Sequence, residues 1–113
     1  METASHADEE GVEAVPQVHL QQGAAADETS VQYFEIEPGA EVPEHSHPHE
    51  QAGYVEQGTF TFLVDGEEIV VEAGDSYVIP GGEPHAAENR GEETVVGVDV
   101  FSPPRTDPDW ADD

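Results

Sequence analysis

Cysteine is absent from this chain of 113 residues, which excludes a disulfide framework, a thiolate nucleophile and a cysteine metal site. Long apolar runs are absent too, and none approaches the ~20 residues that a membrane-spanning helix needs. The first residues carry neither the basic nor the apolar region of a secretory signal peptide. We therefore expect a cytoplasmic protein.

Basic side chains are almost as scarce. The chain has two arginines, Arg90 and Arg105, no lysine, and 27 aspartates and glutamates, for a formal net charge of -25. Phosphate contacts need clustered lysine and arginine, so this composition excludes nucleic acid as a partner. It excludes anionic membrane surfaces for the same reason.

So large a charge of one sign works against compact folding, because the carboxylates repel one another. Molar salt shortens the screening length to about 3 Å and removes most of that repulsion. The composition resembles that of proteins from extreme halophiles, whose cytoplasm accumulates salt. The alternative is an acidic disordered chain, which the strand pattern disfavours.

Turn signals divide the chain into short apolar strands. They recur about every eight to twelve residues from Ser30 onward, a spacing typical of a sandwich or barrel, and no long stretch has helical periodicity. We expect a flexible acidic arm over residues 1–14, one all-β domain over 15–105 and an acidic tail over 106–113. Residues 15–20 are expected as a first edge strand and 21–28 as a loop. The further expected strands are 31–37, 42–47, 51–57, 60–64, 69–71, 76–79, 85–88 and 94–101.

Two segments hold histidines at fixed spacing from glycine. The first follows the pattern Gly-x5-His-x-His-x3-Gln-x6-Gly, at positions Gly39, His45, His47, Gln51 and Gly58. The second follows Gly-x5-Pro-x-Gly-x2-His-x3-Asn, at positions Gly74, Pro80, Gly82, His85 and Asn89. In this order they resemble the two motifs of the single-domain cupins, except that Gln51 replaces a glutamate. The resemblance implies a small double-stranded β-helix, the cupin jelly-roll barrel, around one metal ion.

Strand geometry brings the histidines together. Residues two apart in a strand project to one face, so His45 and His47 point into the barrel together. Pro48 lets the chain turn and return at Gln51, while His85 arrives on a neighbouring strand. Three imidazoles and an amide oxygen then converge on one divalent transition metal, such as nickel, manganese, iron or zinc. The alternative is a barrel without metal, whose histidines fill the cavity.

Gln51 changes the electronic character of this site. A neutral amide leaves the charge of the ion uncompensated, which makes the ion a stronger Lewis acid. Such a site favours small anionic substrates and disfavours dioxygen chemistry. In the alternative arrangement, Gln51 stands behind the ligands and does not reach the ion.

The last strand contributes a third group of residues. Its alternate valines at 96, 98 and 100 share one face, and Asp99 and Phe101 share the other. If the valines pack inside the sandwich, Asp99 and Phe101 project toward the cavity, where a desolvated carboxylate suits general acid–base work. Arg105 follows two stiff prolines and suits bidentate binding of a substrate carboxylate. Taken alone, Arg105 is equally consistent with a solvated surface arginine.

The string HSHPHEQ and the ending from Asp99 to Arg105 are similar to a narrower family, the KdgF-type cupins that linearise uronates. This resemblance implies conversion of a 4,5-unsaturated uronate into an open-chain keto acid. It implies metal ligands at His45, His47, Gln51 and His85. It implies pocket residues at Asp99, Phe101 and Arg105. Here three residues separate the second histidine from the glutamine, where the family can have four.

Three functional classes stay open: a non-redox lyase, isomerase or ring-opening enzyme acting on an anionic sugar derivative, a cupin dioxygenase acting on a small enol or phenol, and a ligand-binding cupin without catalysis. We also expect a homodimer, paired through the strand at residues 15–20. His6 and His19 are expected to lie apart from the site. His49 is expected to be solvated, and the alternative is a position at the rim of the site or behind the metal ligands. The pattern does not decide the roles of Tyr33, Tyr54 and Trp110.

The charge composition generates a prediction about salt. The melting temperature should rise steeply between ~0.1 M and ~2 M KCl, because the screening length shortens from about 10 Å to about 3 Å. Thermal unfolding followed by circular dichroism at several KCl concentrations measures this dependence. A melting temperature that stays flat would show that the acidic charge is compensated locally.

Overall fold

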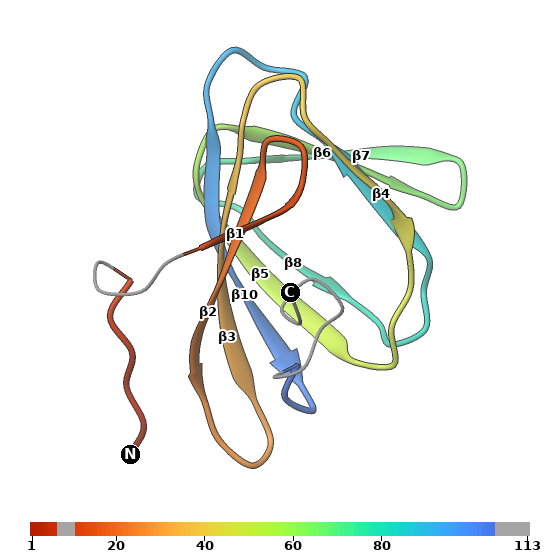
Figure 1. Ribbon diagram of the computed structural model, residues 1–113. Helices are drawn as coiled ribbons and strands as arrows, with labels where there is room; N and C mark the ends of the chain where they lie inside the picture. The colour runs from red at the N-terminus through yellow and green to blue at the C-terminus, as the bar shows by residue number, and fades with distance from the viewer. Residues whose placement is uncertain (7–10, 106–113) are drawn as a thin grey trace.

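The computed structural model describes residues 1–6 and 11–105 (Figure 1). The acidic tail expected over 106–113, with Trp110, lies outside the described residues. Within the described ranges no helix is long and apolar enough to cross a membrane. The chain instead forms ten strands: β1 (Val12–Val15), β2 (Val18–Ala25), β3 (Ser30–Ile36), β4 (Glu41–His45), β5 (Glu50–Gln57), β6 (Thr59–Val64), β7 (Glu67–Glu72), β8 (Ser76–Ile79), β9 (His85–Glu88) and β10 (Val95–Ser102).

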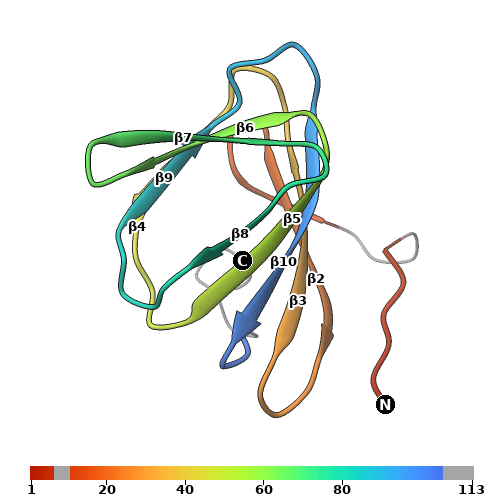
Figure 2. The same cartoon turned by 180° about the vertical axis from the view of Figure 1, so that it is seen from behind.

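The strands form two antiparallel sheets. The six-stranded sheet has the order β1-β2-β3-β10-β5-β8, and the four-stranded sheet has the order β4-β9-β6-β7. Figures 1 and 2 show the two sheets facing one another around a shared interior. The prediction of an all-β jelly-roll barrel is confirmed.

Apolar side chains fill one part of this interior. The rings of Phe34 and Phe60 lie 5.8 Å apart and those of Phe60 and Phe62 4.8 Å apart. Burying each such side chain stabilises the fold by ~1.5–3 kcal/mol. The rest of the interior holds buried polar side chains, among them His47, Gln51, His85 and Asp99. The core thus fixes the barrel and leaves room for a polar site within it.

The first strand differs from the one expected at residues 15–20. That segment forms the end of β1, a turn, and the start of β2, and β2 continues to Ala25 through the expected loop. The turn lies at Pro16 and Gln17, and Gln17 has a φ of 66°. Its backbone N–H donates to the Glu13 carboxylate at 2.7 Å. Strand β1 begins at Val12, inside the segment expected as a flexible arm. It forms one edge of the six-stranded sheet, and pairing of two chains through this edge stays a prediction.

Only part of the prediction about which β10 side chains face the interior is confirmed. Asp99 and Phe101 face the interior and are 5% and 1% exposed. The valines, however, do not pack inside the sandwich: they lie on the outer face of the six-stranded sheet, where Val100 is 36% exposed. The Phe34 ring of β3 fills the interior beside this strand. It fits there because Gly97 of β10 has no side chain: a Cβ at Gly97 would lie 2.4 Å from the ring.

Candidate metal centre

Three histidines meet inside the barrel. His45 ends β4 and pairs in register with His85 at the start of β9, and His47 follows two residues after β4. One ring nitrogen from each lies within 4.8 Å of the other two. His47 and His85 are buried, and His45 is half-buried toward the mouth of the site. The convergence expected from strand geometry is therefore present, although His47 itself lies outside the strand.

Each of the three rings is held by a backbone carbonyl close to it in sequence. The carbonyl oxygen can only accept a hydrogen bond, so the Nδ1 that faces it carries the ring proton. The three pairs are His45–Pro43 at 2.9 Å, His47–His49 at 3.0 Å and His85–Glu83 at 2.9 Å. A neutral ring then presents the lone pair of Nε2, and this arrangement is the usual support of metal-binding histidines.

Gln51 completes a set of acceptors that needs a cation. Its Oε1 lies 3.1 Å from His47 Nε2, close to the ~3 Å between neighbouring ligand atoms bound at about 2.0–2.2 Å from one ion. Burial lowers the pKa of His47 and of His85, and Arg105 lowers both further. Neutral rings and an amide oxygen therefore direct lone pairs at one point. Imidazole donors of this kind fit a divalent transition metal.

Asp99 lies behind Gln51 and is held by Tyr77. The Tyr77 hydroxyl donates to Asp99 Oδ1 at 2.5 Å. Burial raises the pKa of Asp99 to about 6, although hydrogen bonds from Tyr77 and Gln51 and the charge of Arg105 act in the opposite direction. At neutral pH the group is mostly a carboxylate that can accept a proton. Burial and the Asp99 charge raise the pKa of Tyr77, which stays protonated.

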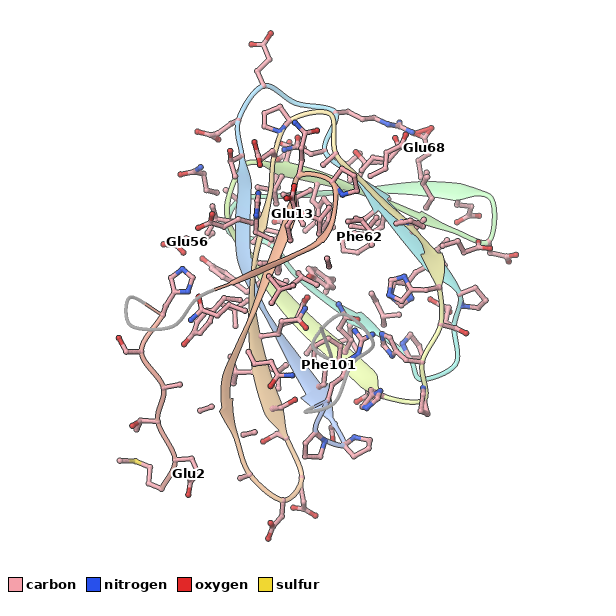
Figure 3. All side chains as sticks on the ribbon, viewed as in Figure 1. Glu2, Glu13, Glu56, Phe62, Glu68 and Phe101 are labelled. Carbon is pink, nitrogen blue, oxygen red and sulfur yellow. The ribbon has the colours of Figure 1, made fainter. Side chains whose placement is uncertain are left out.

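Phe101 lies beside His47, and Arg105 lies over the Phe101 ring. The Phe101 ring is 5.6 Å from the His47 ring (Figure 3 labels Phe101). The Arg105 guanidinium carbon lies 5.3 Å from the centre of the Phe101 ring, and the Arg105 backbone N–H donates to Ser30 Oγ at 2.7 Å. Phe101 thus separates the buried histidines from a cation near the barrel mouth.

Six of the seven expected site residues line a common space, and His47 is not among its lining residues. A cavity of about 80 Å³ is lined by His45, Gln51, His85, Asp99, Phe101 and Arg105, together with apolar side chains of the core. A cleft of about 470 Å³ shares His45 and Arg105 with it and runs between the β1–β2 hairpin and β4. Ligand sites usually measure about 300–1,000 Å³. The cleft is thus large enough for a small molecule, and His45 borders both the cleft and the inner cavity.

Sequence reasoning missed one residue of this site and misplaced another. Tyr77 contacts Asp99, and its inward orientation follows from its alternation with buried Ile79 in β8. His49 was expected to be solvated, but its ring is half-buried and lies 6.0 Å from Phe101. The two prolines before Arg105 bend the chain back over this region. Burial lowers the pKa of His49, as does Arg105.

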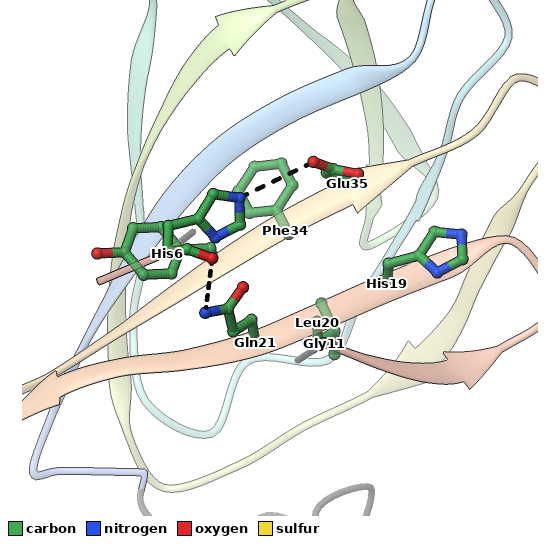
Figure 4. Close-up of a pocket in the computed structure, with 8 residues that line it drawn as sticks. His6, Gly11, His19, Leu20, Gln21, Phe34 and Glu35 are labelled. Atoms are coloured by element: carbon green, nitrogen blue, oxygen red, sulfur yellow. Dashed lines mark hydrogen bonds and ion pairs between the residues drawn. The ribbon is translucent and has the colours of Figure 1, made fainter. Parts of the chain in front are cut away.

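A second cavity, of about 340 Å³, lies on the outer face of the six-stranded sheet (Figure 4). The His6 ring lies 4.6 Å from the Tyr33 ring at a tilt of 45°, and the His6 backbone oxygen accepts a hydrogen bond from the Gln21 side chain. His19 is paired with Glu37 at 2.6 Å, and this hydrogen bond raises the pKa of His19. As expected, His6 and His19 lie apart from the three converging histidines.

The geometry generates a prediction about metal content. Protein prepared without chelators should carry about one divalent transition metal per chain, because three imidazoles and one amide oxygen form one ligand set. Elemental mass spectrometry measures this ratio. The double variant His47→Ala, His85→Ala should lose the metal, whereas His6→Ala should keep it. Full occupancy in the double variant would overturn the assignment.

Known structures resemble most of the chain. The structure of KdgF from Halomonas sp. superposes with a TM-score of 0.83 at 28% identity, covering 92% of this chain and 94% of that one. An RmlC-like cupin from Shewanella frigidimarina NCIMB 400 gives a TM-score of 0.80 at 30% identity, covering 95% and 98%.

Curated relatives match over shorter stretches. The pectin degradation protein KdgF of Dickeya dadantii (strain 3937) is 36% identical over 64 residues, which cover 56% of this chain and 57% of that protein. H2HPP isomerase of Bacillus subtilis is 34% identical over 67 residues, 59% of this chain and 28% of that protein. Both matches cover less than two thirds of the relative. The family model of the cupin domain matches residues 32–101, and the chain belongs to the cupin family.

Proposed function

We propose that this protein binds one divalent transition metal and opens the ring of a small anionic sugar derivative, a 4,5-unsaturated uronate. The product is the open-chain keto acid. Similarity to proteins named KdgF, one of them a pectin degradation protein, supports the substrate class. The observation that carries the proposal is the shared cavity, because two of the three grouped histidines, His45 and His85, border it together with Asp99 and Arg105.

Arg105 is suited to hold the substrate carboxylate. It borders both the inner cavity and the outer cleft, so its guanidinium lies where a substrate enters. A guanidinium binds a carboxylate through two parallel hydrogen bonds. In a chain with a net charge of -25, a cation at this mouth offsets the repulsion that an anionic substrate meets. The sugar ring then lies toward the histidines.

Asp99 is suited to move the proton. In the proposed reaction the C1 hydroxyl loses its proton, the bond from C1 to the ring oxygen breaks, and C1 becomes an aldehyde. The ring oxygen keeps the electron pair as an enolate, and a proton added at C4 gives the ketone at C5. Asp99, mostly ionised at neutral pH, takes the first proton and returns it to C4. A metal held by His45, His47, His85 and Gln51 would supply positive charge close to the developing oxyanion.

This proposal generates a prediction about three variants. Ring opening is measured as loss of the ultraviolet absorbance of the double bond, in excess of the spontaneous reaction. Asp99→Asn should lower kcat by about 10²–10⁴, because it removes the proton acceptor and keeps the shape. Arg105→Lys should mainly raise KM, because it keeps the charge and loses the bidentate fork. Arg90→Lys is the matched control, since Arg90 pairs with Glu68 and Glu88 on the surface.

Wild-type protein that merely matches the spontaneous rate, in its preferred salt and with metal bound, would contradict ring opening. Oxygen uptake with an enol or phenol would then support the dioxygenase alternative. Tight binding of a uronate without product would support a ligand-binding cupin.

A further inference from the structure

A row of three residues crosses the six-stranded sheet behind Gln51. In the strand register Asp99 of β10 pairs with Gly53 of β5, and Gly53 pairs with Tyr77 of β8. Gly53 has no side chain, and a Cβ there would lie 2.1 Å from the Tyr77 ring. The Tyr77 ring therefore extends across β5, over Gly53, and its hydroxyl reaches Asp99.

Gln51 lies two residues before Gly53 on the same face of β5 and is 7% exposed. Its two amide ends meet different surroundings. The oxygen lies 3.1 Å from His47 Nε2, and the amide also hydrogen-bonds Asp99. A carboxylate can only accept, so the amide nitrogen faces Asp99 and the oxygen faces the histidines. The Tyr77 hydroxyl occupies another acceptor position of Asp99 and fixes the carboxylate against this amide.

We infer that Tyr77 and Asp99 form a positioning pair that holds the Gln51 oxygen toward the metal and makes glutamine, rather than glutamate, the suitable residue at this position. A glutamate would place a second carboxylate against Asp99 in a buried place, where like charges at hydrogen-bond distance repel strongly. The departure of this chain from the first cupin motif is thus coupled to Asp99 on another strand. The inference rests on the metal site of the proposed function and is independent of the ring opening.

The first test uses Tyr77, whose hydroxyl contacts Asp99 and the Gln51 amide and none of the three histidines. Tyr77→Phe removes the hydroxyl and keeps the ring, so Asp99 and the Gln51 amide lose their fixed orientation. Loss of such outer partners weakens metal affinity by about 10–100-fold, and we expect at least about 10-fold weaker Ni²⁺ binding in competition with a chelating dye. Tyr54→Phe is the matched control, since Tyr54 is the neighbour of Gly53 on the outer face and 50% exposed.

The second test separates positioning from general damage to the fold. Asp99→Asn is introduced into wild-type protein and into Gln51→Glu protein, and the Ni²⁺ affinity of all four is compared. An asparagine at this place can donate to the carboxylate that Gln51→Glu introduces. The factor by which Asp99→Asn changes the Ni²⁺ affinity should therefore be about 10-fold more favourable in the Gln51→Glu background than in the wild-type background. A structural role of Asp99 alone would change both backgrounds equally.

Two results would overturn the inference: Tyr77→Phe with wild-type Ni²⁺ affinity, or Asp99→Asn with the same effect in both backgrounds. Circular dichroism and the melting temperature of each metal-free variant establish that it is folded. Because Ni²⁺ affinity is measured without sugar, absent ring-opening activity contradicts the proposed function and leaves this inference standing. Conversely, if the protein opens the ring but the effects of Asp99→Asn and Gln51→Glu on Ni²⁺ affinity simply add, only the inference is contradicted.

Discussion

Three local hydrogen bonds to backbone carbonyls determine what this barrel can bind. Each joins the Nδ1 of one histidine to a carbonyl two residues away, so the orientation of the ring follows from local chain geometry. All three Nε2 lone pairs then point at one place, where the Gln51 oxygen joins them. Such converging acceptors repel one another unless a cation lies between them. The chemistry of the site follows from this constraint.

The barrel separates two kinds of interior. Stacked phenylalanines fill the part beside Gly97, where bulky side chains on β10 are excluded. The remaining part holds buried polar groups, most of them hydrogen-bonded, as Asp99 is by Tyr77. Among the described residues, the buried Nδ1 of His49 has no hydrogen-bond partner. The single cation at the mouth, among the residues that line the cavity, is Arg105. A positive charge at the mouth is thus followed by buried polar side chains, and the packed phenylalanines lie beside them.

Sequence reasoning succeeded where residues close in sequence carry the information. The spacing of His45, His47 and Gln51 predicted that they lie together, and alternation predicted the inward face of Asp99. It failed where the outcome depends on distant strands. Tyr77 reaches Asp99 only because Gly53 stands between them in register, and no local pattern contains that relation. The valines were misplaced because alternation separates two faces and does not say which neighbours cover them.

The orientation of the three histidines can be measured directly in metal-free protein. Long-range nitrogen–proton correlation spectra distinguish a ring protonated at Nδ1 from one protonated at Nε2. The account predicts that His45, His47 and His85 each carry the proton on Nδ1 at neutral pH, with Nε2 unprotonated. Protonation at Nε2 in any of the three would remove its lone pair from the centre and contradict the account.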